Sequence, residues 1–536
     1  MSDIINQIKN RIPKRIMICL VIGILSGLFT HAFILTNKLP MWDDMSQFRG
    51  NGMSKVLARW MLDNINWISG DWSVPWTDGF ITILFFSIGA CFVVSALELR
   101  HVTSAVLVPI VMLTYPGVSS ILGFTFTSDS YAFGAMCACA GAYFIRRYKY
   151  GFIAGFACLV MSLGCYQAFL PVAISILCTG WIKDLVSEGK NPKEIIIDIV
   201  KSTLTVLLAT VTYIGIANLL YPNMPGNNGV DEMGSIEISM LPLLVWRAIR
   251  KTVKYFIFEP MSFVNTEMHV ANIACVVLAV CAIGIMFIIN KVYKNVGKIL
   301  LLAIICLTYP IVLSLIYVMA PDANVSMLML YAYVIMYVLA IMMCEMVADT
   351  IDLHKLPKCM VAFCAASVIA ILFVGHSNFI IDNDAYFRSY IAYERVKDYY
   401  SRIMTQVESQ DGYKYGDKVA ILGEFCVTGR NNSNPLSEAY RMDDEKYEDF
   451  SGIALEQGIM TEGARDNFLR IYLGIDLPEM SNEEKDAIRD TDEFRAMSNY
   501  PEAGCIGRIG DVWVVKLDQD WQEYEEEFLK NHDVDM

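Results

Sequence analysis

The chain has 536 residues, of which 55% are hydrophobic and only 18% are charged, and its mean hydropathy is positive. This composition excludes an ordinary soluble protein of this length and indicates an integral membrane protein. The sequence has no Walker loop, no HExxH pair, no GxSxG turn and no dinucleotide-binding glycine motif in a βαβ context, and its six histidines are scattered. These features argue against nucleotide-driven chemistry and against a histidine-rich metal centre.

Long apolar stretches recur through the first 375 residues, and each is near the ~20 residues that a helix needs to cross ~30 Å of hydrocarbon. The first stretch is too long for a signal peptide and lacks a small-residue cleavage site, so we expect it to be retained as a span. We count about eleven such stretches. They are residues 17–35, 80–97, 102–115, 131–145, 152–166, 169–182, 199–220, 273–289, 299–317, 327–347 and 360–374. Residues 1–375 are therefore predicted to form an all-α polytopic membrane domain.

The distribution of Lys and Arg predicts the orientation of these spans, because basic residues accumulate in cytoplasmic loops. They gather in alternate segments, namely residues 9–15, 100–101, 146–149, 183–193, 291–298 and 354–358. These segments are predicted to be cytoplasmic together with the N-terminus. The outer loops are then residues 36–78 and 221–266. An odd number of spans places the segment after the last one outside as well.

Residues 376–536 form a chemically different segment. They contain 17 Lys and Arg against 35 Asp and Glu, a net charge of −18. Strand-like runs at 418–422 and 506–517, with helical patterns such as 389–407 and 464–472, predict an acidic extracytoplasmic α/β domain. Its charge argues against a nucleic-acid partner and against binding to anionic lipid headgroups.

Polar residues concentrate in the first outer loop. The residues in question are Asp43, Asp44, Arg49, Arg59 and Trp60. Two adjacent carboxylates could supply a general base and an orienting or cation-binding group, and the arginines could hold a phosphate through bidentate hydrogen bonds. The alternative is that Asp43 and Asp44 only cap a helix at the membrane surface.

Two further polar groups lie at the predicted outer ends of spans. Asp129 is the only carboxylate near the junction of the third and fourth spans, where it could act as an acid or simply occupy the first turn of a helix. Tyr166 and Gln167 form the turn between the fifth and sixth spans. Tyrosine is common at membrane interfaces, whereas a glutamine at this depth needs a partner, for which a sugar or a phosphate is one candidate.

The second outer loop contains an amphipathic stretch, residues 238–258. Arg247, Arg250, Lys251 and Lys254 alternate there with large apolar residues. This pattern predicts a helix in the membrane interface, either as an anchor or as a cradle for a lipid-linked phosphate.

The order of these motifs resembles the bacterial O-antigen glucosyltransferase family of type II, the serotype-converting Gtr group with a GT-C-like membrane fold. The resemblance rests on Trp42-Asp43-Asp44, Arg59-Trp60, Gly164-x-Tyr166-Gln167-Ala168-Phe169 and the Gly510 to Lys516 segment. It covers nearly the whole chain. No single motif is specific, and it is their order and topology that match.

The resemblance implies transfer of glucose or a related hexose from an undecaprenyl-phosphate-linked donor to a cell-surface glycan. Asp44 or Asp43 would deprotonate the acceptor, with Asp129 as an auxiliary acid. Arg49, Arg59, Trp60, Tyr166, Gln167, Arg247, Arg250 and Lys254 are the candidate substrate-binding residues. No cofactor is implied, and a divalent metal is compatible with the chemistry but not required by it.

Two other functions fit part of the pattern. A multi-spanning transporter or lipid-linked-sugar flippase would also be polytopic, but carriers usually place charges deep within spans, and here Glu345 is the chief exception. A non-enzymatic assembly partner with an outer binding domain is excluded only by the Asp43-Asp44 pair.

Overall fold

The computed structural model describes residues 12–39, 57–70, 72–221, 238–258, 266–321, 325–350, 358–423 and 462–517. The chain divides into two compact units. Apart from Leu39, the described residues up to Ala385 belong to the first unit, and those from Tyr386 onward belong to the second.

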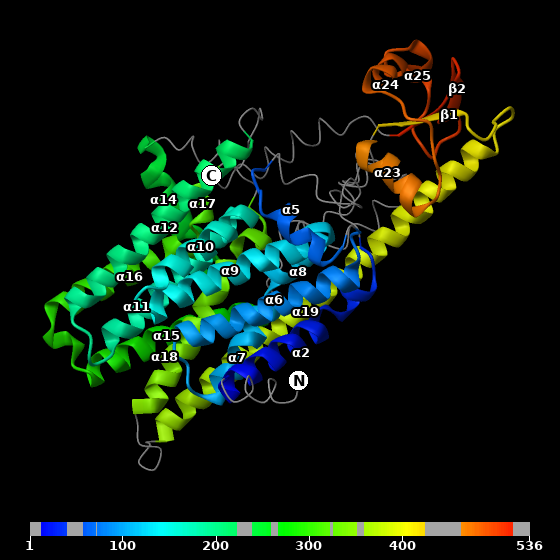
Figure 1. The fold of residues 1–536 in the computed structure, drawn as a ribbon. Coiled ribbons are helices and arrows are strands. Elements are labelled where there is room, and N and C mark those ends of the chain that lie inside the picture. Colours follow the sequence, from blue (N-terminus) through cyan, green and yellow to red (C-terminus); the bar gives the residue numbers. More distant parts are fainter. Residues whose placement is uncertain are drawn as a thin grey trace, which may run out of the picture. The chain divides into compact units, whose positions relative to one another are not determined.

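The first unit is a bundle of helices (Figure 1). Its first half contains α2 (Lys14–Thr36), α5 (Leu62–Ile65), η1 (Asn66–Ile68), α6 (Pro75–Ala96), α7 (Val102–Leu113), α8 (Pro116–Gly123), η2 (Thr125–Thr127), α9 (Ser128–Arg147), α10 (Gly151–Cys165), η3 (Gln167–Phe169) and α11 (Leu170–Val186). Its second half contains α12 (Pro192–Leu220), η4 (Ile238–Met240), α14 (Leu241–Val253), η5 (Lys254–Phe258), α15 (Thr266–Ile289), η6 (Val292–Lys294), α16 (Val296–Leu313), α17 (Ile316–Met319), η7 (Met327–Tyr333), α18 (Val334–Thr350) and the start of α19 (Lys358–Glu408).

Each of the eleven predicted stretches lies in helical structure, but fewer helices qualify as spans. Among the described residues, eight helices are long and apolar enough to cross a membrane, or nine if the bent pair α7 and α8 counts as one span. The two other predicted stretches correspond to α9, which does not meet this test, and to α10, which has only 15 residues. A multi-pass membrane protein is thus supported, and the count of eleven is not confirmed.

Glycines let the helices of this bundle approach one another closely. A Cβ atom at Gly23 of α2 would lie 2.8 Å from Ser87 Oγ of α6, and one at Gly27 would lie 2.7 Å from Ile83. Without aqueous solvent to drive association, contacts between small residues contribute much of the packing energy of membrane helices. These glycines therefore allow α2 to lie directly against α6.

The centre of the bundle is rich in buried tyrosines, and the hydroxyl groups of several of them have protein partners. Tyr331 donates to the carbonyl of Met112 at 3.1 Å, and Tyr337 donates to Asn272 Oδ1 at 2.7 Å. Each bond joins η7 or α18 to another helix, and a buried hydroxyl without a partner would cost free energy. The tyrosines thus fix how η7 and α18 pack.

The helix α19 spans 51 residues and continues from the first unit into the second. Its apolar window extends from Ala362 to Phe387, beyond the predicted end of the last span at residue 374. The segment contains no proline and only one glycine, Gly375, so nothing in the sequence interrupts the backbone hydrogen bonds. The predicted helix 389–407 is therefore a continuation of this helix.

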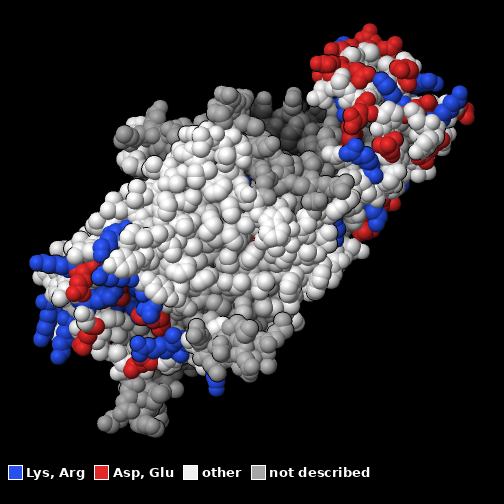
Figure 2. All heavy atoms as spheres, viewed as in Figure 1, with Lys and Arg blue, Asp and Glu red and all other residues white. Residues whose placement is uncertain are grey.

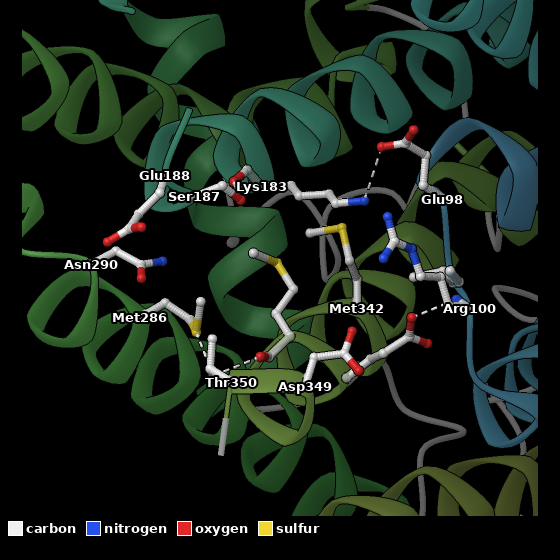
Figure 3. A pocket seen from close by; sticks show the side chains of 13 residues that line it. Glu98, Arg100, Lys183, Ser187, Glu188, Met286, Asn290, Met342, Asp349 and Thr350 are labelled. Atoms are coloured by element: carbon white, nitrogen blue, oxygen red, sulfur yellow. Dashed lines mark hydrogen bonds and ion pairs between the residues drawn. The ribbon is translucent and has the colours of Figure 1, made fainter. Parts of the chain in front are cut away.

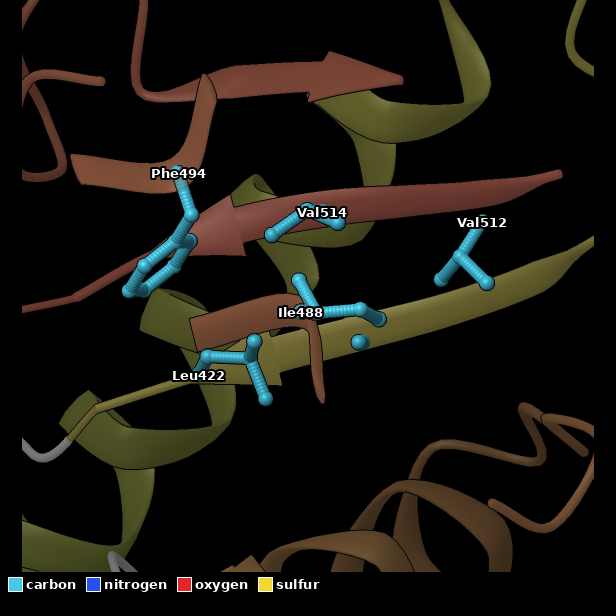
Figure 4. Packing of buried hydrophobic residues seen from close by; sticks show 6 residues of the cluster. Leu422, Ile488, Phe494, Val512 and Val514 are labelled. Carbon is cyan, nitrogen blue, oxygen red and sulfur yellow. The ribbon is translucent and has the colours of Figure 1, made fainter. Parts of the chain in front are cut away.

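The second unit contains a three-stranded sheet in the order β1-β3-β2. Besides the end of α19, the described elements of this unit are β1 (Lys418–Leu422), α23 (Glu462–Tyr472), α24 (Asn482–Arg489), α25 (Asp492–Ala496), β2 (Ile506–Ile509) and β3 (Val512–Lys516). β1 pairs parallel with β3, and β2 pairs antiparallel with it. Figure 4 shows the core, in which side chains of the sheet pack against Ile488 and Phe494 of the two short helices. The location of this unit outside the membrane stays a prediction.

Candidate active site

The first polar cluster is built where the segment before α5 packs on the end of α10. The backbone N–H of Met61 donates to the carbonyl of Gly164 at 3.0 Å. A Cβ atom at Gly164 would lie 2.7 Å from Cε2 of the Trp60 indole, closer than real Cβ contacts come. The glycine of the Gly164-x-Tyr166 motif is therefore required for Trp60 to lie where it does.

Arg59 lies among aromatic rings of two other helical segments. Its Nη1 donates to the hydroxyl of Tyr131 at 2.5 Å, and its guanidinium carbon lies 4.4 Å from the centre of the Tyr166 ring. The rings of Tyr131 and Tyr166 stack on each other at 4.9 Å. Cation–π contacts of this kind stabilise a guanidinium group without neutralising it.

The charge of Arg59 has remaining capacity to bind an anion. Its Nε is buried and has no hydrogen-bond partner. No carboxylate within the described part of the chain forms an ion pair with it. The neighbouring Trp60 also has a buried indole N–H without a partner. These two N–H donors suit an anionic group such as a phosphate.

Two buried carboxyl groups lie at the starts of α6 and α9, and the one on α9 precedes Tyr131 by two residues. Asp129, in the first turn of α9, accepts from the backbone N–H of Ser130 at 2.6 Å and from Ser69 Oγ at 2.8 Å. Asp78, in the first turn of α6, accepts from the N–H of Val74 at 2.8 Å, and its Oδ1 has no partner.

Asp78 and Asp129 form a pair. They are close enough to interact electrostatically, and the hydroxyl of Ser69 lies within hydrogen-bonding reach of both. The exposed fractions of Asp78 and Asp129 are only 2% and 1%. Helix capping accounts for one oxygen of Asp78 but leaves the other free to accept a hydrogen bond from a substrate hydroxyl.

Gln167 has a protein partner. Its Nε2 donates to the hydroxyl of Tyr213 on α12, and this hydroxyl lies 3.4 Å from the carbonyl of Ala58. The glutamine thus links the turn after α10 to the segment that carries Arg59. In this arrangement Gln167 supports the cluster, whereas Tyr166 contributes a ring to it.

The basic residues of the amphipathic stretch lie elsewhere, on α14 and η5. Leu244, Ala248 and Thr252 form the buried face of α14 at helical spacing. Arg247 lies next to Ala248 of this face and donates to the carbonyl of Pro321 at 2.9 Å. Arg250 is exposed and Lys254 is half-buried. No contact between the described residues joins these three basic side chains to Asp129 or Arg59.

Three of the predicted site residues, Asp43, Asp44 and Arg49, lie outside the described residues. The structure therefore does not test their roles. In the part that it does describe, no group of three or more His, Cys, Asp or Glu side chains is placed to hold a metal ion.

The other end of the bundle carries most of its cations. Along α9, Arg146 lies 17 residues after Asp129, which corresponds to about 25 Å of helix. Arg146 pairs with Asp184 at 3.2 Å, and Lys183 donates to the carbonyl of Leu97. Figure 2 shows basic side chains mixed with acidic ones at this end, while the adjoining flank of the bundle shows almost no charge.

A cavity of about 340 Å³ opens at the Arg146 end between the ends of α6, α11, α15 and α18 (Figure 3). Glu345 borders it and accepts from the backbone N–H groups of Arg100 and His101 at 2.6 and 3.4 Å. Because these N–H groups precede α7, the carboxylate caps that helix. The chief charge within the predicted spans thus has a structural partner, which weakens the argument for a transporter.

Asp78, Ser69 and Tyr131 are not among the site residues predicted from the sequence. Asp78 stands four residues after Val74 at the start of an apolar run, where a carboxylate looks like a simple cap. Only the packing of α6 on α9 brings it to Asp129. The one feature of the sequence that could have indicated a role for Asp78 in the site is its position as the last residue of the predicted outer loop.

Residues 32–344, more than half of the chain, match the family model described as Glucosyl transferase GtrII. No curated protein and no solved structure matches the chain. The matched region includes Arg59, Asp78, Asp129 and Tyr166 and ends before α19. This match confirms the resemblance inferred from the sequence motifs. The chain belongs to the GtrII glucosyltransferase family and is a multi-pass membrane protein.

Proposed function

We propose that the protein transfers glucose, or a related hexose, from a polyprenyl-phosphate-linked donor to a cell-surface glycan on the outer face of the bacterial inner membrane. The observation that carries this proposal is the buried pair Asp78 and Asp129, with one free carboxyl oxygen, together with the cation Arg59, which donates to Tyr131 two residues after Asp129 on α9. A carboxyl oxygen can accept a hydrogen bond from the acceptor hydroxyl, and a cation can bind the donor phosphate. Sugar transfer requires these two kinds of group next to each other.

The positive-inside rule supports this placement. The Arg146 end carries most of the cationic loops and is assigned to the cytoplasm. Asp129 begins the same helix and therefore belongs to the outer face. The second unit follows the last span and, with an odd number of spans, lies on that face as well.

The chemistry follows from the charges. A carboxylate of the first outer loop, Asp44 in preference to Asp43, takes the proton from the acceptor hydroxyl. The hydroxyl oxygen then forms a bond to the anomeric carbon of the sugar, and the bond from that carbon to the phosphate oxygen breaks. Polyprenyl phosphate leaves as an anion, and Arg59 stabilises its developing charge. Asp129 and Asp78 orient the acceptor through hydrogen bonds.

The test replaces each carboxyl group by its amide in Asp44→Asn, Asp43→Asn, Asp78→Asn and Asp129→Asn. Membranes with equal amounts of each variant are assayed for release of polyprenyl phosphate and for sugar on the glycan. Loss of the general base is expected to reduce the rate about 10²-fold or more. Loss of one orienting hydrogen bond at Asp129 or Asp78 is expected to cost about tenfold.

Glu188→Gln is the matched control, because it makes the same chemical change at an exposed site bordering the cavity at the other end. It should leave the rate unchanged. Full activity in all four aspartate variants would rule out the mechanism. Uptake of a solute by liposomes without sugar transfer would instead favour a transporter.

A further inference from the structure

The part of α19 inside the bundle carries two polar side chains on one face. Asn378 and Asp382 are four residues apart and therefore lie one above the other on the helix. Both are fully buried, with an exposed fraction of 0%, and both lie within the apolar window Ala362–Phe387. Ionisable residues at this depth are rare and usually have a function.

These side chains leave several buried polar atoms without partners. One oxygen of Asp382 accepts a hydrogen bond from Ser119 Oγ of α8, but its Oδ2 has none. Neither the oxygen nor the nitrogen of the Asn378 amide has a partner, and neither does the buried hydroxyl of Ser377. By contrast, the adjacent Asn383 donates to the carbonyls of Thr30 and Phe379.

A water molecule could satisfy the amide and the hydroxyl, but it would not neutralise a carboxylate. Burial of an unpaired charge costs several kcal/mol even after relaxation. A proton on Asp382 would remove the charge, and the resulting hydroxyl would then be expected to donate to the amide oxygen of Asn378, one turn away. That bond is not formed, so both oxygens remain available to a ligand.

We propose that Asp382, Asn378 and Ser119 bind a monovalent alkali cation between α19 and α8. The free oxygens of Asp382 and Asn378 are its ligands, with a lone pair of Ser119 Oγ as a third. Side chains at this helical spacing have Cβ atoms about 5–6 Å apart, which leaves room for an ion between their oxygens. A single carboxylate balances one positive charge, whereas divalent sites in proteins draw on more oxygen ligands and often several carboxylates.

The proposed cation site lies next to the segment of the chain that leads to the buried carboxyl pair. Ser119 belongs to the short helix α8, which follows the bend after α7. Through η2 the chain then reaches Asp129 within ten residues of Ser119. A cation shared by α19 and α8 therefore fixes the segment that leads to the buried carboxyl pair. This inference does not depend on the proposed reaction.

The test measures binding of radioactive Na⁺ to the purified full-length protein in lipid nanodiscs, with choline keeping the ionic strength constant. Unlabelled Na⁺ and K⁺ compete in separate arms and identify the preferred ion. We expect saturable binding and a higher melting temperature in the preferred alkali ion than in choline. Asp382→Asn should abolish both effects, and Asn378→Ala should weaken binding at least tenfold.

Asn383→Ala is the matched control, because it removes an amide of α19 that already has two backbone partners, the carbonyls of Thr30 on α2 and Phe379 on α19. It should bind the ion as the wild type does. The Asp382→Asn protein should also remain folded in choline, since it has no charge to neutralise. The proposal is wrong if neither ion binds saturably, or if binding survives Asp382→Asn. A melting temperature that follows pH but not the alkali ion would overturn it in favour of a protonated carboxyl group.

Discussion

Replacing Gly164 by alanine tests whether the packing of the Trp60 ring against Gly164 positions the candidate active site. The new Cβ atom would lie 2.7 Å from Cε2 and 2.8 Å from Cζ2 of the indole, whereas ordinary contacts begin at 3.4 Å. The ring must therefore move by 0.7 Å, the difference between 3.4 and 2.7 Å. Overpacking of this kind costs about 1–3 kcal/mol.

The displacement reaches Arg59, because it precedes Trp60 in the chain. Misplacement of a reacting group by about 1 Å can cost 10²-fold in rate. We expect Gly164→Ala to reduce sugar transfer by about 10- to 10²-fold while most of the bundle remains folded. The assay compares the transfer rate in membranes with the melting temperature of the purified protein.

Gly215→Ala serves as the control, because a Cβ atom at this position of α12 meets nothing within 4 Å. It should keep full activity and gain about 0.5–1 kcal/mol of stability from its helix propensity. A second variant, Gly164→Ala with Trp60→Leu, removes the clashing ring and should recover the lost stability. Full activity of Gly164→Ala alone would refute the role assigned to this contact.

Further predictions concern other parts of the chain. Arg59→Lys keeps the charge but loses the planar group that lies against Tyr166, so transfer should fall about tenfold at an unchanged melting temperature, and an unchanged rate would contradict the stacking argument. Glu345→Gln should lower the melting temperature without a matching loss of transfer, because the weaker amide acceptor caps α7 less well. The N–H groups of Lys414 and Trp513 hold the pKa of Asp417 below its ordinary value of 3.8. Its contribution to stability is therefore present above this value and lost as the pH falls through the lowered pKa. Hydrogen exchange of β1, corrected for intrinsic rates, should show this loss, and Asp417→Asn should remove the pH dependence.

Buried carboxyl groups within the spans bear on the choice between an enzyme and a transporter. Glu345 caps a helix, which explains one buried charge without transport. The continuation of α19, however, places Asp382 inside an apolar window, so this span also contains a buried carboxyl group. Ion binding there is consistent with a structural role next to α8, and the liposome assay separates this role from transport.

Local patterns along the chain were enough to predict the membrane character, the long apolar helices of the first unit and the family. Helix location follows from local apolar runs, and the family from the order of motifs such as Gly164-x-Tyr166 and Arg59-Trp60. Both are properties of neighbouring residues or of their order along the chain, so no tertiary contact was needed to predict them. The predicted strand-like run 418–422 corresponds to β1 for the same reason, whereas the single predicted run 506–517 is divided in the structure into the antiparallel strands β2 and β3.

Only the tertiary structure decided which polar residues meet. Asp78 and Asp129 are 51 positions apart, and each alone looks like a residue of a first helical turn. Their proximity depends on α6 packing against α9, as the Asp382 site depends on α19 packing against α8. The hydrogen bond from Gln167 to Tyr213 likewise depends on the packing of α12 against the turn after α10. Side-chain pairing across helices depends on rotation and depth in the bundle, and hydrophobic periodicity in one segment does not encode either of them.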